Sequence, residues 1–203
     1  MPARNKDLHG MVPDHSNVAL VLVDVINDLD FEGGELLLPY ALKAAERIAE
    51  LKRRCKERKI PVIYVNDNWG RWQSDLSKLM EHCVERDAPG KPIVQLLAPE
   101  GDDYFVLKPK HSGFFDTTLD TVLHALRIRR VILTGIAGNI CVLFTANDAY
   151  MRDLKIYTPA DCIVSNTVAD NDHALHQIET VMKGIVVPST RLVFRTATSR
   201  RTR

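Results

Sequence analysis

The sequence lacks any marked charge imbalance. Its 203 residues contain 27 lysines and arginines against 26 aspartates and glutamates, which gives a formal net charge of +1. Proteins that bind nucleic acid or anionic membranes through their overall field carry a much larger positive excess. We therefore expect a small-molecule substrate, with no nucleic acid and no membrane as partner. The short basic segment at residues 197–203 is interpreted as a disordered tail.

Long apolar runs are also missing. The longest one, residues 18–25, is interrupted by Asp24 and is far shorter than the roughly 20 residues of a membrane-spanning helix. Residues 1–16 contain no apolar core of the signal-peptide type, and we interpret them as an N-terminal extension. Both absences favour a soluble protein.

Cysteine is scarce. The four cysteines, at positions 55, 83, 141 and 162, show no CxxC spacing. A disulfide-rich scaffold or a zinc finger needs closely spaced pairs, so neither is expected. The cysteines are typical of free thiols in a reducing compartment, which predicts a cytoplasmic protein.

The sequence does contain a regular alternation of strand and helix patterns. Near-continuous β-branched runs, typical of buried parallel strands, alternate with segments of helical apolar spacing. Strands are predicted at residues 17–25, 60–67, 103–110, 129–137, 155–163 and 191–196, and helices at 40–59, 71–84, 117–128, 139–153 and 170–185. The alternation predicts an α/β fold over residues 17–196, a three-layer αβα sandwich around a mainly parallel, Rossmann-like sheet of about six strands.

Three residues with reactive side chains stand where predicted strands end. Asp24 follows the first strand, Lys108 lies near the end of the third, and Cys141 lies in the turn after the fourth. Taken alone, each has an ordinary structural explanation as a turn or capping aspartate, a solvated lysine or a core cysteine. In a parallel sheet, however, all three meet at the edge where ligands bind. Their joint position favours a functional site.

A carboxylate, an ammonium and a thiol at one edge can carry out nucleophilic catalysis. A helix N-terminus and a nearby lysine both favour the thiolate of Cys141. Asp24 can accept the thiol proton and later return it, as general base and then as acid. Unpaired backbone N–H groups at the start of the helix can hold an oxyanion. The small residues Gly135, Ala137 and Gly138 let a carbonyl approach that backbone.

Three motifs in a fixed order carry a resemblance to a known family. They are ALVLVDVINDL with Asp24, VLKPKHSGFFDTTLD with Lys108, and VILTGIAGNICVLFTANDAY with Cys141. In these motifs the chain resembles the isochorismatase-like cysteine hydrolases, a group that includes nicotinamidases, N-carbamoylsarcosine amidases and ureidoacrylate amidohydrolases. The likeness covers roughly residues 17–188, nearly the whole predicted domain, and so implies an isochorismatase-like hydrolase domain.

The resemblance implies a role for each motif residue. Asp24 matches the family's general base, Lys108 the lysine that orients and stabilises charge, and Cys141 the nucleophile. The resemblance also implies a cis peptide between Ile136 and Ala137. That peptide would direct the N–H group of Ala137 toward the site, beside that of Cys141, and the two would form an oxyanion hole.

Two departures from the family's patterns narrow the expected chemistry. Nicotinamidases carry an Asp-x-His pair after the second strand, followed by another histidine, to bind a metal. Here Asp67 aligns, but Trp69 stands at the histidine position and no second histidine follows nearby. The resemblance therefore implies no metal and no cofactor, and it disfavours nicotinamidase activity. Isochorismatases that cleave a vinyl ether lack the cysteine, so Cys141 disfavours that reaction.

Loop residues near the same edge form a candidate substrate pocket. They are Phe31, Asn68, Trp69, Trp72, His111 and Phe114. Packing beneath a loop explains the two tryptophans equally well, and a solvent-facing loop position is the ordinary interpretation of His111.

We therefore expect a metal-independent cysteine hydrolase of the amidase type. It would cleave a C–N bond of a small amide, carbamoyl or ureide substrate through a Cys-Asp-Lys triad and a thioester intermediate. A non-catalytic binding or assembly protein on the same fold stays open, as does an isochorismatase-like hydrolase acting on another bond type. A nucleotide-binding domain is disfavoured, because DVINDLDFEGG contains no glycine-rich fingerprint. The family commonly forms homo-oligomers, which implies a dimer or a tetramer.

Overall fold

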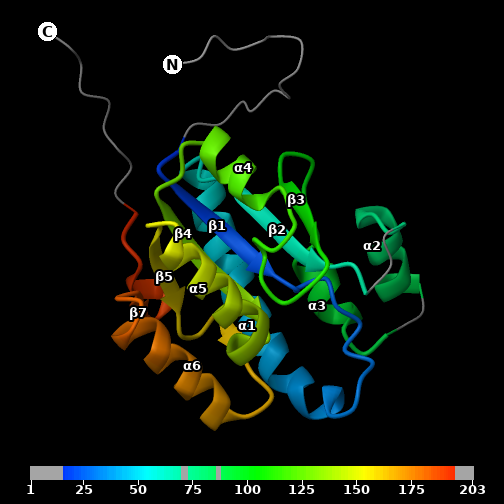
Figure 1. Cartoon of the computed structure of the whole chain (residues 1–203). Coiled ribbons are helices and arrows are strands. Elements are labelled where there is room, and N and C mark those ends of the chain that lie inside the picture. The colour runs from blue at the N-terminus through cyan, green and yellow to red at the C-terminus, as the bar shows by residue number, and fades with distance from the viewer. Residues whose placement is uncertain (1–15, 70–72, 86–87, 195–203) are drawn as a thin grey trace, which may run out of the picture.

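A parallel sheet forms the centre of the molecule (Figure 1). The computed structural model describes residues 16–69, 73–85 and 88–194. Its strands are β1 (Val18–Val23), β2 (Val62–Asp67), β3 (Tyr104–Lys108), β4 (Arg130–Ile136), β5 (Lys155–Pro159), β6 (Ile163–Val164) and β7 (Ile185–Val187). They pair in the order β3-β2-β1-β4-β5-β7, with β6 beside β4. The predicted α/β fold with a parallel sheet is confirmed.

Helices cover both faces of this sheet. They are α1 (Gly34–Glu57), α2 (Leu76–Glu85), α3 (Lys91–Leu96), α4 (Leu119–Ala125), α5 (Leu143–Met151) and α6 (Val168–Thr180), with a π-helical turn η1 (Gly138–Val142) and a 3-10 turn η2 (Ser189–Arg191). Figure 1 shows α4 and α5 in front of the sheet and α1 behind it. Buried side chains of α1, α2 and α3 join one apolar cluster, and those of α4, α5 and α6 join another.

Strand β1 shows why the sequence produces two cores. All six of its residues are buried. Leu20 and Leu22 face the cluster on the α1 side, whereas Ala19, Val21 and Val23 face the cluster on the α4 and α5 side. Successive side chains of a strand point to opposite faces, so an unbroken apolar run is needed when both faces are covered.

The first helix begins earlier than predicted. The sequence pattern predicts a helix from Tyr40, but α1 begins at Gly34 and contains Pro39. The prediction assigned Pro39 to the preceding loop because proline lacks the N–H group that a helix interior uses. In the structure Pro39 lies near the start of a 24-residue helix, where one missing hydrogen bond is offset by the burial of residues further along it.

The predicted last strand, residues 191–196, is wrong in the part that is described. Ser189–Arg191 forms η2, residues 192–194 have no regular structure, and residues 195–196 lie outside the described residues. The strand at that end is instead β7, because the chain turns at Lys183, whose φ is +56°. The helix predicted to reach residue 185 therefore ends earlier, at Thr180, and the apolar residues 185–187 pair with β5.

A further helix stands where the sequence indicated only a loop. No helix was predicted between residues 84 and 103, but Lys91–Leu96 forms α3. Gly90 precedes it and lies directly against the segment that follows β1. A Cβ atom on Gly90 would fall 1.9 Å from the carbonyl oxygen of Asn27. The glycine is needed for this close approach.

The strand order locates the ligand crevice. From β1 the chain proceeds to β2 and β3 on one side and then continues with β4 on the other side of β1. In open parallel sheets, ligands bind at such a reversal, outside the carboxyl ends of the strands. Here those ends belong to β1 and β4, which lead to Asp24 and to the turn that contains Cys141.

Candidate active site

Asp24 occupies the first position after β1. Its backbone N–H donates to the carbonyl of Val65 on β2 at 3.0 Å, and its φ of +51° lies in the left-handed region. Aspartate tolerates this region better than most residues. The side chain is buried, and its Oδ1 accepts a hydrogen bond of 2.6 Å from the N–H of Asp67 at the end of β2. The neighbouring strand thus holds the carboxylate in position.

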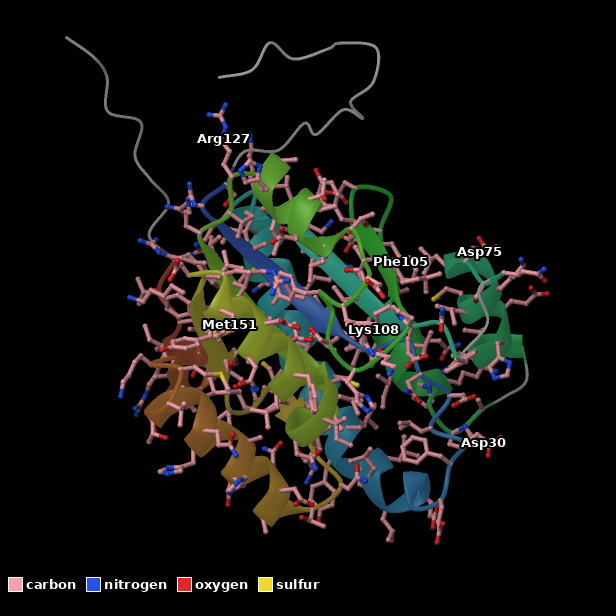
Figure 2. All side chains as sticks on the ribbon, viewed as in Figure 1. Asp30, Asp75, Phe105, Lys108, Arg127 and Met151 are labelled. Atoms are coloured by element: carbon pink, nitrogen blue, oxygen red, sulfur yellow. The ribbon has the colours of Figure 1, made fainter. Side chains whose placement is uncertain are left out.

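Lys108 ends β3 and is completely buried. Its Nζ lies 2.8 Å from Oδ2 of Asp24, 3.8 Å from Oδ2 of Asp67 and 3.5 Å from Sγ of Cys141. Figure 2 shows Lys108 toward the same end of the sheet as Asp30, while Arg127 lies at the other end. The structure therefore brings the three predicted reactive groups together.

The turn after β4 presents the sulfur of Cys141. Gly135 has a φ of +120°, and a Cβ atom there would lie 2.0 Å from the carbonyl oxygen of Val23. The glycine is needed because β4 and β1 approach closely at the edge that carries the site. The peptide bond between Ile136 and Ala137 is cis.

The segment that contains Cys141 is a π-helical turn. The sequence pattern predicted a helix from residue 139, but η1 occupies Gly138–Val142 and α5 begins only at Leu143. The carbonyl of Ala137 accepts hydrogen bonds of 3.1 Å from the N–H groups of both Ile140 and Val142. Such turns often occur at functional sites, and periodicity in the sequence does not reveal them.

Burial and charge determine the protonation of the three groups. Burial raises the pKa of Asp24 above its ordinary value of 3.8, although the charge of Lys108 and a hydrogen bond from Cys141 lower it in part. Burial by itself would lower the pKa of Lys108, but the negative charge of Asp24 and the hydrogen bond to its carboxylate raise it. The lysine therefore remains charged beside the carboxylate.

Burial and the charge of Asp24 both favour the protonated form of the Cys141 thiol. Burial, followed by the charge of Asp24, raises the pKa of Cys141 to about 12, and the charge of Lys108 offsets only part of this rise. Lys108 acts in the expected direction, but burial and Asp24 act against it, so the lysine does not by itself stabilise the thiolate. The relative effects of burial, Asp24 and Lys108 on the pKa of this thiol depend on the folded structure and were not visible in the sequence.

A cavity of about 630 Å³ opens beside these groups. The described residues that line it are Asp24, Asn27, Asp28, Asp30, Phe31, Leu37, Asp67, Trp69, His82, His111, Ile136, Ala137, Ile140, Cys141 and Asn166. Its volume suits a small-molecule ligand. Among the described lining residues there are four aspartates and two histidines but neither arginine nor lysine.

The predicted pocket residues fall into three groups. Phe31, Trp69 and His111 line the cavity. Asn68 is buried away from the lining, and its backbone N–H donates to the carbonyl of Lys108 at 3.2 Å. It therefore extends the contact between the ends of β2 and β3. Trp72 lies outside the described residues.

The assignment of Phe114 to the pocket is wrong. Phe114 is buried in the core cluster on the α4 and α5 side, and the guanidinium of Arg152 lies over its ring at 4.5 Å. The chain after Lys108 turns away from the cavity here, because the N–H of Gly113 donates to Oγ1 of Thr145 on α5 at 2.9 Å. Position in a loop near the strand end did not reveal this turn.

Several lining residues were missed by the sequence analysis. They are Asn27, Asp28, Asp30, Leu37, His82, Ile140 and Asn166. The rule that strand ends carry the site could have identified the residues that follow β1. No such signal existed for His82, which reaches the cavity from α2. Its Nε2 lies 2.8 Å from Oδ2 of Asp28, and its ring centroid lies 4.5 Å from that of Trp69.

The residues around Asp67 do not fit a metal site. Oδ2 of Asp67 faces the positive Nζ of Lys108, and Oδ1 accepts a hydrogen bond from the backbone N–H of Trp69. Within the described parts of the chain, no group of three or more histidine, cysteine, aspartate or glutamate side chains is arranged to hold a metal ion. We therefore derive no step that uses a metal.

Comparison with known proteins identifies the family. The family model described as the isochorismatase domain matches residues 18–190. The chain is 46% identical over 164 residues to the uncharacterized isochorismatase family protein YaaI of Bacillus subtilis, covering 81% of this chain and 90% of that protein. It is 31% identical over 193 residues to the ureidoacrylate amidohydrolase RutB of Methylorubrum extorquens, covering 82% of this chain and 78% of that protein.

Solved structures agree with this assignment. The N-carbamoylsarcosine amidase of Thermoplasma acidophilum is similar with a TM-score of 0.70 and 26% identity, over 88% of this chain and 99% of that chain. The fold and the sequence matches together define a hydrolase with an open, parallel α/β sheet. The chain belongs to the isochorismatase family. No helix in the described residues is both long and apolar enough to span a membrane.

Proposed function

We propose that this hydrolase is a metal-independent cysteine amidase that cleaves a C–N bond in a small amide, carbamoyl or ureide substrate. One observation carries the proposal. The buried ammonium of Lys108 lies 2.8 Å from the carboxylate of Asp24 and 3.5 Å from the sulfur of Cys141, beside a cavity of about 630 Å³. Cys141 is half-buried, whereas the other three cysteines are buried.

The first step forms a bond between the sulfur and the substrate carbonyl carbon. The thiol of Cys141 is hydrogen-bonded to Asp24, so its proton moves to that carboxylate as the sulfur attacks. Because burial and Asp24 raise the pKa of the thiol, the S–C bond forms together with the proton transfer. Lys108 stabilises the negative charge that develops beside it.

The turn after β4 supplies the donors for the tetrahedral oxyanion. In the proposed mechanism these donors are the backbone N–H groups of Ala137 and Cys141. Within the described residues, no acceptor contacts the N–H of Ala137. The carbonyl of the same residue is fixed by two hydrogen bonds from η1. Ala137 and Cys141 both line the cavity, which supports the assignment.

Collapse of the tetrahedral intermediate completes the acylation. The C–N bond breaks, and the leaving nitrogen takes the proton that Asp24 accepted from the thiol. Ammonia or an amine departs and the acyl group remains on Cys141 as a thioester. Water then attacks this thioester, which releases the acid and restores the thiol.

The substrate class is supported by the names of the relatives. RutB is named a ureidoacrylate amidohydrolase, and the solved structure with 26% identity is an N-carbamoylsarcosine amidase.

Two other functions are distinguished by experiment. A non-catalytic binding protein on this fold would need no reactive thiol, yet Cys141 lies beside Asp24 and Lys108 at the cavity. An isochorismatase-type hydrolase acting on a different bond would release no ammonia or amine. Both alternatives thus differ from the proposal in their products and in their dependence on the cysteine.

The test is a screen for ammonia or amine release from small amides, carbamoyl compounds and ureides. Cys141→Ala provides the control for each positive substrate. We expect its turnover to fall by at least about 10⁴-fold, as for removal of other catalytic nucleophiles, with circular dichroism and thermal unfolding close to wild type. Wild-type activity in Cys141→Ala would overturn the proposed mechanism.

We also propose a homo-oligomer, either a dimer or a tetramer. Exposed apolar side chains on α5 and α6 support it: Phe144, Tyr150 and Met151 on the first, and Val168 near the start of the second. Figure 2 shows Met151 at the end of α5. Light scattering on the purified protein tests this proposal, and a monomer at micromolar concentration would contradict it.

The proposed setting is the cytoplasm. All four cysteines are free in the structure, which supports a reducing compartment. Fractionation of cells that express the protein at its natural level would test this, and recovery of the protein outside the cytoplasm would contradict it.

A further inference from the structure

His111 is a third polar side chain in contact with the reactive sulfur, after Lys108 and Asp24. Its Nδ1 lies 3.9 Å from Sγ of Cys141, and the residue lines the cavity. Lys108 and Asp24 are buried, whereas His111 is exposed to solvent. The sulfur therefore has a buried proton acceptor in Asp24 and a solvent-accessible one in His111.

The position of His111 is fixed by the helix that follows Cys141. The two residues after His111 are tied to α5, because Oγ of Ser112 donates to Oδ2 of Asp148 at 2.5 Å and the N–H of Gly113 donates to Oγ1 of Thr145 at 2.9 Å. The hydroxyl of Thr145 in turn donates to the carbonyl of Cys141 at 2.7 Å. Helix α5 therefore holds both the loop that carries His111 and the backbone of Cys141.

The ring of His111 also packs against an aromatic side chain. Its centroid lies 5.4 Å from that of Phe144, with the planes inclined at 55°. Phe144 belongs to the first turn of α5, three residues after Cys141. An imidazole packed in this way presents one nitrogen to the sulfur without needing to reorganise.

One step of the proposed amidase reaction still needs a base, and the imidazole of His111 lies where it can act as one. During acylation, Asp24 receives the thiol proton and returns it to the leaving nitrogen. Hydrolysis of the thioester then requires a base for the incoming water. Water enters from the cavity, where His111 is exposed, while the carboxylate of Asp24 is buried and already bonded to Lys108 and to the N–H of Asp67.

We propose that His111 is a further catalytic residue, which activates water for hydrolysis of the thioester on Cys141. The inference rests on the proposed amidase function. Neutral His111, with its proton on Nε2, accepts a proton from water at Nδ1 while the water oxygen bonds to the acyl carbon. The C–S bond then breaks, and the proton passes from Nδ1 to Sγ. An acid is released and both side chains return to their starting states.

The test separates acylation from deacylation with p-nitrophenyl acetate as the probe. Release of p-nitrophenolate reports acylation, and intact-protein mass with peptide mapping reports the acetyl group on Cys141. We expect His111→Ala and His111→Phe to acylate within a few-fold of wild type but to lose the acetyl group about 100-fold more slowly, the usual contribution of a general base. His124→Ala, a change at an exposed histidine on α4, should behave as wild type.

Imidazole rescue distinguishes proton transfer from packing. The acetyl-enzyme is first separated from excess ester, because imidazole cleaves the ester by itself. We expect added imidazole to restore deacylation in His111→Ala, where a space is left beside Phe144. We expect no restoration in His111→Phe, where the new ring occupies that space. Phenylalanine retains the aromatic contact, so a packing role would give His111→Phe the deacylation rate of wild type.

The outcomes separate the inference from the function on which it rests. If acetyl-Cys141 forms and all variants deacylate at the wild-type rate, His111 has no role in water activation and the inference is overturned, while the amidase proposal stands. Wild-type deacylation in His111→Phe would also overturn it. If Cys141→Ala releases p-nitrophenolate as fast as the wild type, and neither the wild type nor a His111 variant carries an acetyl group on Cys141, the proposed function fails and the inference fails with it.

Discussion

Two buried lysines of this protein have similar partners and different surroundings. Lys52 on α1 is 5% exposed, and its Nζ lies 2.8 Å from Asp103, 2.9 Å from Glu100 and 3.1 Å from the carbonyl oxygen of Ala98. Lys108 is 0% exposed, and its Nζ lies 2.8 Å from Asp24 and 3.5 Å from the sulfur of Cys141. Both lysines are therefore buried ammonium groups with a close carboxylate.

The two ammonium groups differ in the other groups that surround them. Three oxygen acceptors surround the ammonium of Lys52, and the ring of Tyr64 lies 5.3 Å from it, so this cluster joins α1 to β2 and to the segment before β3. The ammonium of Lys108 instead shares a carboxylate with a thiol at the wall of a cavity. A fully satisfied buried charge supports the fold, whereas one that faces a reactive group can stabilise a change in charge.

The largest expected effect comes from the carboxylate partners. Asp24→Asn should lower kcat/KM by about 10³-fold, because an amide cannot accept the thiol proton during acylation. Asp103→Asn makes the same chemical change beside Lys52, and we expect its folded fraction to retain kcat/KM. Steady-state kinetics on a substrate found in the ammonia-release screen measures both. Equal losses of kcat/KM in the two variants would contradict the functional difference between the carboxylate beside Lys108 and the one beside Lys52.

The next effect comes from the lysines themselves. Lys108→Met should lower kcat/KM by about 100-fold, since a charge that stabilises the developing anion is lost. Lys52→Met should leave the activity of the folded protein unchanged but reduce its free energy of unfolding by about 1–3 kcal/mol, because hydrogen bonds of a buried charge are lost while Asp103 keeps its ion pair with Lys56. Urea denaturation and kinetics on the same preparations measure the two quantities.

The residues at the strand ends were predictable from the sequence, and the way the site is completed was not. Asp24, Lys108 and Cys141 follow from alternating strands and helices, because a parallel sheet places the ends of its strands at one edge. The π-helical turn around Cys141 was not predictable, since one extra residue in a helical turn leaves no mark in the apolar pattern. The thiol pKa was not predictable because it depends on burial.

The cavity wall was only partly predictable. Phe31 and His111 were found because they lie in loops next to strand ends, but the same reasoning wrongly included Phe114. That loop turns back to α5 through a single hydrogen bond between Gly113 and Thr145, which no local pattern indicates. His82 was missed because it reaches the cavity from α2, far from any strand end.

A smaller effect is expected in the pH dependence. Asp24 must be ionised to accept a proton, so kcat/KM should fall as pH decreases through the pKa of this carboxyl. Burial raises that pKa above 3.8, and Lys108 holds it down in part. The acid limb in wild type should therefore lie above the range of an exposed aspartate, and Lys108→Met should move it to higher pH. Lys52→Met should leave it in place, and a shift in that variant would contradict the assignment to Asp24.

The smallest effect concerns the charge of the cavity beside Lys108. Asp30 is exposed and is one of the four aspartates among the described residues that line this cavity. Asp30→Lys should shift the ratio of kcat/KM between a neutral amide and a matched anionic one toward the anion, by about tenfold or less for a partly solvated charge. Asp172→Lys makes the same charge change on α6 and should leave the ratio unchanged. An equal shift in both variants would show a non-local effect of net charge.

The most direct test of the central claim is the rate at which iodoacetamide alkylates Cys141, followed by peptide mapping in wild type, Asp24→Asn and Lys108→Met. The negative charge of Asp24 raises the pKa of this thiol and the positive charge of Lys108 lowers it. We therefore expect Asp24→Asn to alkylate Cys141 faster than wild type although it hydrolyses substrate more slowly, and Lys108→Met to alkylate it more slowly. Cys55, Cys83 and Cys162, all buried, should react far more slowly in each protein. Equal alkylation of Cys141 in the three proteins, or labelling of the buried cysteines at the same rate, would contradict the account.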